Sequence, residues 1–476
     1  MTFYWYDFET FGTQPASDRP SQFAGLRTDD DFKIIDQPLV LYCKPARDVL
    51  PQPEACLITG ITPQLADEKG LPEAAFIKKI LHEFSQPDTC VTGFNNIRFD
   101  DEVTRHCLYR NFYDPYAREW QNGNSRWDIL DLLRATRLLR PEGINWPNRE
   151  DGSPSFKLEH LTSANGIDQT GAHDALVDVY ATINIARLVK RKQPQFFDYV
   201  LQNKSKQAVG QQLNVQSKKP VLHVSSKYPA EKGCGAIVLP LARDQLNKNA
   251  TYVYDLSVDP EPLLTLSADE LRARIFTASS ELPEGQERVP LKAVHANKCP
   301  IVVPVSVVTP EVAERLTIDL QQCRANMDRI LQAQGLTEKV EEIFSQRQFE
   351  PREDPDHMLY SGGFFSSRDR QLMDKVPATP PEKLADLTLP FHDQRLPEML
   401  FRYRARNYPD TLNAGELSKW EDYRLNRITQ SDGGGSITLE EYDRQIAEKM
   451  ADPECSGKDQ AILNALKDYR AQLLGH

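Results

Sequence analysis

The sequence lacks the patterns that mark a secreted, membrane-bound or disulfide-linked protein. Its eight cysteines are scattered over 476 residues with no pair separated by two residues, which argues against a zinc site or a disulfide framework. No apolar run approaches the roughly 20 residues that a membrane-spanning helix needs. The first residues, MTFYWYDFET, contain neither the basic nor the apolar segment of a secretory signal. We therefore expect a cytoplasmic protein with no membrane partner, whose cysteines are mostly small core residues.

Positive charge is also in short supply. The chain has 57 Lys and Arg against 69 Asp and Glu, a net charge of −12. That balance ordinarily counts against a nucleic-acid ligand, because phosphate binding depends on clustered Lys and Arg. Residues 187–227 are a local exception, with nine basic residues against the single acid Asp198. This stretch is either a phosphate-binding surface or a solvated linker, and the sequence leaves both interpretations open.

The length predicts more than one domain, and the pattern of apolar and turn-forming residues changes twice along the chain. Residues 1–193 alternate strand-like runs with helical patterns, which predicts an α/β domain with a mixed sheet. Apolar residues at helical spacing predict a helix over 172–190 that packs on this sheet. Residues 194–348 contain short strands broken by Pro, Gly and Asn, which favours a small β domain with a helical tail. After the proline-rich joint FEPREDPDH, residues 350–472 read as successive amphipathic helices.

Two carboxylates lie close together near the start of the chain. Asp7 and Glu9 are two residues apart in the first predicted strand, so their side chains share one face of it. Two such charges repel each other, and burying them is costly unless cations neutralise them; Mg²⁺ and Mn²⁺ prefer such oxygen ligands. The alternative is an exposed strand end with ordinary charges.

Two further acidic signals follow, each weak alone. Asp100 comes after a strand, Gly93 and an Asn95-Asn96 turn, where it could line a site at the sheet edge or merely cap a helix. His173 and Asp178 lie near the start of a later helix, AHDALVDVYAT, where a titrating imidazole could face the same cluster. Their ordinary alternatives are a histidine without special role and a surface charge.

Together, DxE on a first strand, FD after a second strand and HxAxxD on a later helix resemble the motifs of the DEDDh exonucleases, which have an RNase H-like fold. The resemblance implies that Asp7, Glu9, Asp100 and Asp178 bind two Mg²⁺ ions, for which Mn²⁺ can substitute. It also implies that His173 is the general base that deprotonates water. The chemistry is consistent, because phosphodiester hydrolysis needs an activated water and stabilisation of charge on the attacking and leaving oxygens.

Other stretches are similar to bacterial exonuclease I, among them DFETFGTQPASDRPSQFAGLRTD, LPQPEACLITGITPQ, GFNNIRFDDEVTRHCLYRNFYDPYA and LFRYRARNYPDTL. This resemblance implies an exonuclease domain followed by an SH3-like β domain and a C-terminal helical domain. It also implies a monomer that degrades single-stranded DNA from 3′ ends to 5′-mononucleotides in repair and recombination. Two alternatives remain: an RNA-trimming 3′ exonuclease, since the carboxylates do not distinguish sugars, and a non-catalytic nucleic-acid scaffold.

Candidate substrate contacts follow from residue type and from the resemblance. Basic and aromatic residues are interleaved around the Asp100 helix, as in proteins that hold single strands by phosphate contacts and base stacking. We expect about half of the aromatic residues to be core instead. The candidates are Glu9, Arg105, Tyr116, Trp120, Arg134 and Lys157, the last at a position where the family more often carries Arg.

A protein partner is implied as well. Members of the exonuclease I family dock the acidic, Phe-ended tail of single-stranded DNA-binding protein, which requires a basic and partly apolar pocket. Arg140 is our candidate for that contact. The segment Gln430–Glu441 resembles an EF-hand calcium loop, but Gln430 replaces its first acidic ligand, so we predict an ordinary loop between helices.

Overall fold

The computed structural model describes residues 1–169, 171, 174–345 and 352–475, and its chain divides into two compact units. The first unit comprises Met1–Arg126, Gln169–Tyr180 and Glu350–His476, and the second comprises Trp127–Asp168 and Ala181–Phe349. The first unit is therefore discontinuous, since it combines the beginning of the chain with its end.

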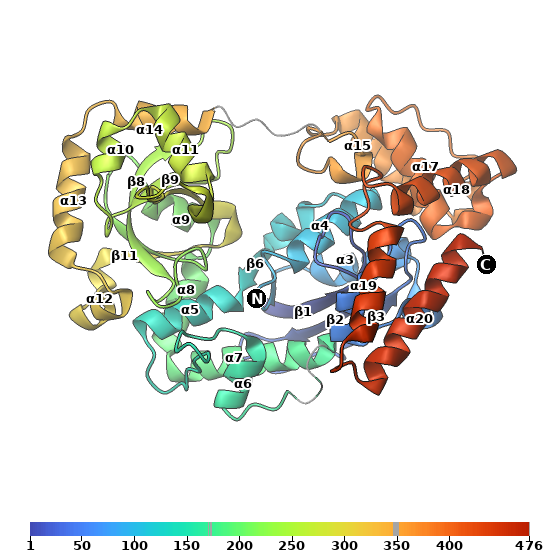
Figure 1. Cartoon of the computed structure of the whole chain (residues 1–476), viewed down its shortest axis with the longest axis horizontal. Coiled ribbons are helices and arrows are strands. Elements are labelled where there is room, and N and C mark those ends of the chain that lie inside the picture. The colour runs from blue at the N-terminus through green and yellow to red at the C-terminus, as the bar shows by residue number, and fades with distance from the viewer. Residues whose placement is uncertain (170, 172–173, 346–351, 476) are drawn as a thin grey trace. The chain divides into compact units, whose positions relative to one another are not determined.

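The first unit contains a mixed sheet, as the sequence predicts (Figure 1). Its strand order is β4-β3-β2-β1-β5-β6; β1 pairs with β2 antiparallel and with β5 parallel. The strands are β1 (Thr2–Thr10), β2 (Pro20–Thr28), β3 (Leu39–Cys43), β4 (Gly70–Leu71), β5 (Thr89–Gly93) and β6 (Ser125–Asp128), in which the chain passes into the second unit.

Helices from both ends of the chain complete this unit. The N-terminal helices are α1 (Pro53–Thr59), α2 (Pro63–Lys69), α3 (Glu73–Phe84) and α4 (Asp100–Arg110). The C-terminal helices are α15 (Ser367–Met373), α16 (Lys375–Ala378), α17 (Arg395–Asn407), α18 (Ala414–Thr429), α19 (Leu439–Ala451) and α20 (Gly457–Leu474). α7 (Ala175–Lys192) begins in this unit and continues into the second.

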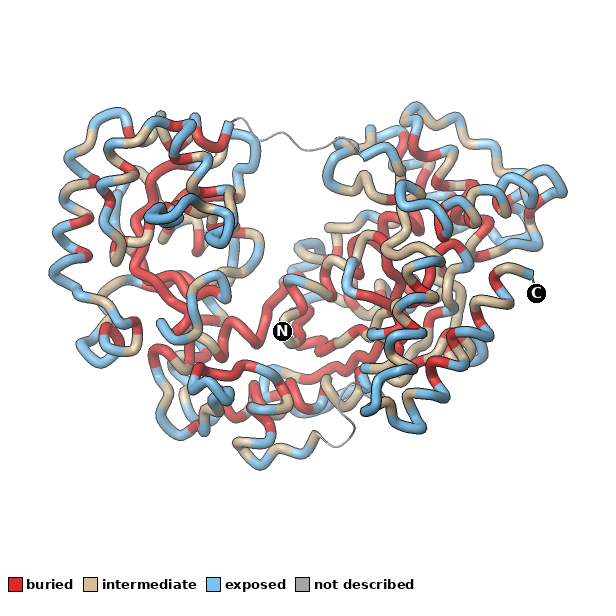
Figure 2. The backbone as a smooth tube through the Cα atoms, in the orientation of Figure 1, coloured by how far each residue is buried: buried red, intermediate tan, exposed pale blue. Residues whose placement is uncertain are grey.

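Alternation along β1 explains how the sheet is covered. Tyr4, Tyr6 and Phe8 lie in one hydrophobic cluster with residues of α3 and α4. The side chains between them point to the other face, where Phe3 and Trp5 pack edge-on against Phe32. β2 and β5 are buried along their whole length and β1 along most of its length (Figure 2).

Buried ion pairs connect the start of the chain to the C-terminal helices. The carboxylate of Asp48, which is fully buried, accepts a hydrogen bond from Arg406 on α17 at 2.7 Å and lies 3.5 Å from Arg427 on α18. Burial alone would raise the pKa of Asp48, but Arg406, Arg19 and Arg427 hold it well below its ordinary value. A buried charge is tolerated when it is paired in this way, and removing one partner costs about 3–5 kcal/mol.

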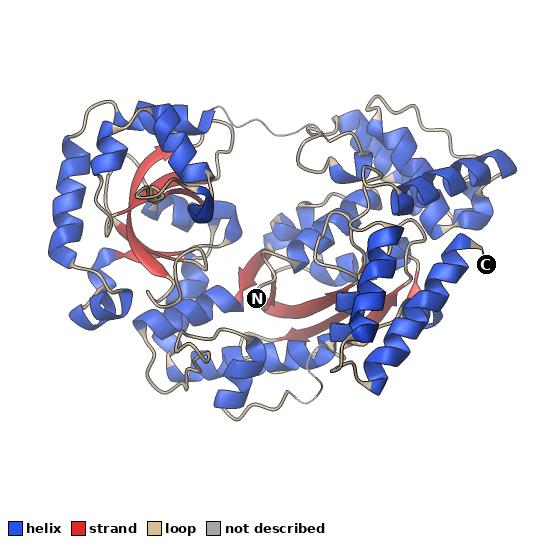
Figure 3. Cartoon of the chain, viewed as in Figure 1, coloured by secondary structure: helices blue, strands red, loops and turns tan. Residues whose placement is uncertain are grey.

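The second unit is built around a five-stranded antiparallel sheet, enclosed by helices in Figure 3, with strand order β10-β9-β8-β7-β11. Tyr252 on β9 stacks on Phe344 of α14 with ring centroids 3.8 Å apart. The strands are β7 (Val221–Val224), β8 (Gly235–Arg243), β9 (Ala250–Asp255), β10 (Leu291–His295) and β11 (Ile301–Pro304). The helices are α5 (Ile129–Leu139), α6 (Leu158–Ala164), α8 (Pro194–Asn203), α9 (Lys206–Gln212), α10 (Glu261–Thr265), α11 (Ala268–Phe276), α12 (Pro310–Leu316), α13 (Leu320–Gln332) and α14 (Leu336–Ser345).

Within the described part of the chain, every helix is too short or too polar to span a bilayer. Six of the eight cysteines are buried, as expected for core residues, whereas Cys299 and Cys455 are half-buried.

Candidate active site

Three carboxylates converge where β1 meets the start of α7. Oxygen atoms of Asp7, Glu9 and Asp178 all lie within 4.8 Å of one another. Asp7 and Glu9 share a strand face because they are two residues apart. Asp178 reaches them from the first turn of α7. The structure thus brings together three of the residues that the sequence motifs select.

Asp100 joins this group from the start of α4. Its Oδ1 accepts the backbone N–H of Phe8 at 3.0 Å, so the carboxylate is held against β1 beside Asp7. The capping alternative considered for Asp100 is not what the helix uses, because the N-cap residue is Phe99 and no side chain caps the helix. Asp100 is buried.

The proximity of these carboxylates raises their affinity for protons. Burial, followed by the charges of Asp100, Glu9 and Asp178, raises the pKa of Asp7 well above its ordinary value. Burial, then Asp178 and Asp100, raises the pKa of Glu9 to about 8. A divalent cation would relieve this repulsion, and carboxylate oxygens are the donors that Mg²⁺ and Mn²⁺ prefer. The donor set therefore fits a metal site.

Two glutamines that sequence reasoning missed hold Asp178 and its helix. Gln169 donates from Nε2 to Asp178 Oδ1 at 2.7 Å. Gln22 lies opposite Glu9 in the β1–β2 register and accepts the backbone N–H of Ala175, the first residue of α7, at 3.2 Å. The pairing of Gln22 with Glu9 depends on strand register, which no local motif reveals. His173, the predicted general base, lies outside the described residues.

Asp101, the neighbour of Asp100, is a fully buried carboxylate that the motifs did not select. It accepts hydrogen bonds from Tyr6 at 2.8 Å, Arg118 at 2.6 Å and Arg126 at 2.5 Å. Burial alone would raise the pKa of Asp101, but the two guanidinium groups hold it well below its ordinary value. Asp101 is thus a buried charge compensated by two cations.

The aromatic residues around α4 divide between core and surface, as expected. Tyr109 and Trp127 are buried, whereas Trp120 is 66% exposed and Tyr116 is half-buried. Arg105 is itself buried: it is paired with Glu119 and Glu102, and its guanidinium carbon lies 5.4 Å from the centre of the Tyr116 ring. The buried, ion-paired guanidinium of Arg105 thus packs against the Tyr116 ring and helps to fix its position.

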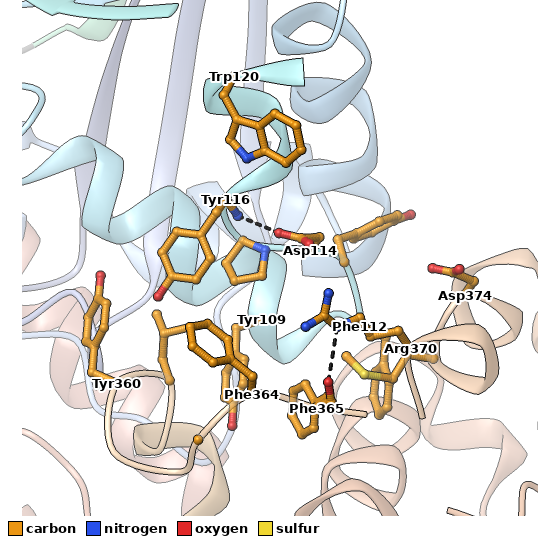
Figure 4. Close-up of a pocket in the computed structure, with 15 residues that line it drawn as sticks. Tyr109, Phe112, Asp114, Tyr116, Trp120, Tyr360, Phe364, Phe365, Arg370 and Asp374 are labelled. Carbon is orange, nitrogen blue, oxygen red and sulfur yellow. Dashed lines mark hydrogen bonds between the residues drawn. The ribbon is translucent and has the colours of Figure 1, made fainter. Parts of the chain in front are cut away.

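Tyr116 and Trp120 line a pocket of about 410 Å³ whose second wall comes from residues 359–374 (Figure 4). On that wall Phe365 stacks on Tyr109 at 6.0 Å, while the adjacent Phe364 is 89% exposed. Tyr360 hydrogen-bonds to Glu102, two residues beyond Asp100 on α4. The pocket thus adjoins the helix that carries one of the clustered carboxylates.

Comparisons with known proteins agree along the whole chain. An exonuclease family model matches residues 4–186, the exonuclease I SH3-like domain matches 204–346 and the exonuclease I C-terminal domain matches 353–473. The exodeoxyribonuclease I of Haemophilus influenzae is 47% identical over 100% of this chain and 99% of its own length. That of Escherichia coli is 50% identical over 90% of each chain. The chain belongs to the exonuclease I family.

Solved structures of exonuclease I agree with the fold. A moderately thermophilic exonuclease I from Methylocaldum szegediense has a TM-score of 0.96 at 53% identity and 99% coverage of both chains. The zinc-bound complex of E. coli exonuclease I with single-stranded DNA has a TM-score of 0.94 at 46% identity, with the same coverage. The complex SSB/exonuclease I with the inhibitor CFAM has a TM-score of 0.91 at 46% identity, again covering 99% of each chain. The exonuclease, SH3-like and C-terminal domains implied by the resemblance are confirmed.

The remaining predicted contacts of this exonuclease I family member lie in the second unit. Lys157 is exposed, and its Nζ lies 3.6 Å from Glu159. Arg134 is half-buried and donates to Asp131 at 2.6 Å. Arg140 is exposed at a pocket of about 210 Å³ that it shares with Phe196, Tyr199 and other residues of this unit.

The EF-hand-like segment forms the loop between α18 and α19, as predicted, and its last three residues form the start of α19. Gly433 and Gly435 pack so closely on the backbone of α18 that a Cβ at either would approach its atoms to within 3 Å. The Glu441 carboxylate, which would be the last calcium ligand, accepts hydrogen bonds from Arg444 and Gln445. The glycines therefore serve helix packing.

Proposed function

We propose that this chain degrades single-stranded DNA from its 3′ end and releases 5′-mononucleotides, in DNA repair and recombination. The observation that carries the proposal is the convergence of Asp7, Glu9 and Asp178 beside Asp100, in a chain that belongs to the exonuclease I family. The relatives' names specify deoxyribonucleic acid as the substrate, and one solved relative was bound to single-stranded DNA.

Asp7, Glu9, Asp100 and Asp178 would hold two divalent ions, Mg²⁺ with Mn²⁺ as a substitute. Such ions, when bound, lower the pKa of water and stabilise charge on the phosphoryl oxygens. In this proposal His173 takes the proton from the attacking water, and Gln169 keeps Asp178 oriented. The water oxygen bonds to phosphorus and the bond to the 3′ oxygen breaks, so the phosphate stays on the released nucleotide.

The substrate strand would be held by stacking and by basic side chains. Tyr116 and Trp120 offer aromatic faces to bases upstream of the cut, and Phe364 extends the same surface. Base stacking on aromatic side chains is tolerant of sequence and contributes about 1–3 kcal/mol per base. Glu9, Lys157, Arg134 and Arg105 complete the proposed contacts, with Arg105 acting through its support of Tyr116.

We also propose that the pocket at Arg140 binds the acidic tail of single-stranded DNA-binding protein. Arg140 is exposed and lines this pocket with Phe196 and Tyr199, and its Nη1 donates to the Leu139 carbonyl at 2.6 Å, so the pocket combines a positive charge with apolar walls. That combination suits a peptide with acidic residues and a terminal phenylalanine. A solved complex of SSB with a relative of this chain supports the choice of partner.

The domain limits 1–193, 194–348 and 350–472 belong to the same proposal, because the three family models fall within or close to them. All four proposed metal ligands come from one chain, which supports action as a monomer. A cytoplasmic location follows from the proposed substrate, since the enzyme would work where a bacterial cell keeps its DNA.

A strand-choice assay tests the proposal. Matched single-stranded DNA and RNA oligonucleotides, labelled at either end, are incubated with the full chain and Mg²⁺. We expect the 3′ label to leave DNA first as a mononucleotide, faster than from RNA. Faster degradation of RNA, or first release of the 5′ label, would overturn the substrate or the direction. The Asp178→Ala variant gives the background rate.

A further inference from the structure

The two residues that flank Asp7 on β1, Tyr6 and Phe8, each donate a hydrogen bond to one of the first two residues of α4. The Tyr6 hydroxyl donates to Asp101 Oδ1 at 2.8 Å, and the Phe8 N–H donates to Asp100 Oδ1 at 3.0 Å. Tyr6 and Phe8 point their side chains away from Asp7, into the core between β1 and α4. The two hydrogen bonds thus bracket Asp7 and set its position relative to Asp100.

Asp101 can serve as an anchor because it is itself held on several sides. Its two oxygens accept Arg118 at 2.6 Å and Arg126 at 2.5 Å, and its backbone N–H donates to Asn96 at 2.8 Å. Arg118 lies over the Phe84 ring at 4.8 Å, and Arg126 also pairs with Glu119 at 3.1 Å. Hydrogen bonds to charged groups are shorter and stronger than neutral ones, so this carboxylate has little freedom to move.

Tyr6 is equally restrained. Its side chain is buried, and its ring lies 4.9 Å from that of Phe84 and 6.2 Å from that of Phe23. The hydroxyl therefore cannot leave Asp101 without moving β1 or the aromatic core. A rigid link runs from the Arg-bound carboxylate through Tyr6 to the backbone of Asp7.

We propose that Asp101, with Tyr6, is a positioning residue of the nuclease site: the Tyr6–Asp101 bond keeps Asp7 at the separation from Asp100 at which both can bind the same divalent ion. This inference rests on the proposed metal ligands. Partners that orient ligands in this way typically change metal affinity by about 10–100-fold when they are removed. They touch neither substrate nor ion.

The variant Tyr6→Phe tests this role because it removes only the hydroxyl and leaves the aromatic packing. Tyr4→Phe is the matched control: Tyr4 lies on the same strand, its ring contacts the same Phe84, and its buried hydroxyl has no hydrogen-bond partner within the described part of the chain. Mn²⁺ is titrated calorimetrically into each full-length protein without DNA, and kcat and KM are measured on a labelled oligonucleotide.

We expect Tyr6→Phe to weaken Mn²⁺ binding by about tenfold and to lower kcat by a similar factor, with KM for the oligonucleotide unchanged. Tyr4→Phe should match the wild type in all three quantities. Arg118→Lys keeps a cation on Asp101 with fewer donors, so it should weaken Mn²⁺ binding in the same direction by a smaller factor. A purely structural role would lower the melting temperature without shifting the Mn²⁺ isotherm.

The outcomes separate the two proposals. If wild-type Mn²⁺ binding does not depend on Asp178, as judged against Asp178→Ala, the metal site itself is wrong. If that dependence is present but Tyr6→Phe and Arg118→Lys both bind Mn²⁺ as tightly as Tyr4→Phe, the positioning role of Asp101 is overturned and the metal site stands.

Discussion

Replacing Glu9 by glutamine should stabilise the metal-free protein while it impairs the nuclease. Burial and the charges of Asp178 and Asp100 raise the pKa of Glu9 from 4.5 to about 8. In the folded state Glu9 therefore holds its proton more tightly than in the unfolded chain. Its contribution to stability is fully present below about pH 4.5 and is lost as the pH rises towards 8.

The size of the effect follows from the shift. A rise in the pKa of Glu9 from 4.5 to about 8 corresponds to a loss of about 5 kcal/mol of folding stability at high pH. Glu9 is partly reached by solvent, and charge interactions there are screened, so we expect about 2–3 kcal/mol. Glutamine carries no charge at any pH, so Glu9→Gln avoids this loss of folding stability. At pH 8 with a chelator, its melting temperature should exceed that of the wild type by about 5 °C, and the two should coincide near pH 4.5.

Thermal unfolding followed by circular dichroism in EDTA, at several values between pH 4.5 and 8.5, measures the effect. Added Mg²⁺ should stabilise the wild type more than Glu9→Gln, because ligand binding to the folded state adds stability. Glu68→Gln, at an exposed carboxylate on α2, serves as the control. Equal melting temperatures of Glu9→Gln and wild type at pH 8 in EDTA would refute the reasoning.

Other predictions concern catalysis, DNA and the partner. Asp178→Ala should reduce Mg²⁺-dependent cleavage to background while DNA affinity, measured by fluorescence anisotropy, stays within a few-fold; full activity would exclude the mechanism. Trp120→Ala and Phe364→Ala should each weaken oligonucleotide binding by about 5–150-fold, the equivalent of about 1–3 kcal/mol. Leu246→Ala, a control at an exposed residue of the second unit, should leave the affinity unchanged. Unchanged affinity in all three variants would show that the aromatic pocket does not bind DNA. Arg140→Ala should weaken binding of an acidic, Phe-ended peptide by at least about tenfold and reduce its salt dependence; identical isotherms for variant and wild type would place the tail elsewhere.

Much of the carboxylate site could be predicted because its geometry follows from local periodicity. Side chains two residues apart on a strand point to the same face of the sheet, so the sequence alone places Asp7 and Glu9 side by side. The mixed sheet followed from alternating strand and helix patterns, whereas Asp100 and Asp178 were selected only because the three motifs together resemble those of the DEDDh exonucleases. Naming the second domain SH3-like required the resemblance, because short strands with turns are common to many β folds.

The parts that could not be predicted depend on contacts between distant segments. The sequence assigned no functional role to Asp101, since Tyr6 and Arg126 reach it from strands β1 and β6 and Arg118 from the short helix at Ala117–Glu119. Likewise the wall of the aromatic pocket that carries Phe364 lies far along the chain from Trp120. Tertiary pairing of this kind leaves no local pattern in a single sequence.

The discontinuity of the first unit bears on how the protein is made. β1 leaves the ribosome long before α17 and α18, yet these segments belong to one compact unit. Until α17 and α18 emerge, Asp48 lacks the guanidinium groups of Arg406 and Arg427, and a carboxylate without them is costly to bury. The first unit should therefore be complete only after α17 and α18 have left the ribosome, and a product truncated before them should be more sensitive to proteases than the full chain.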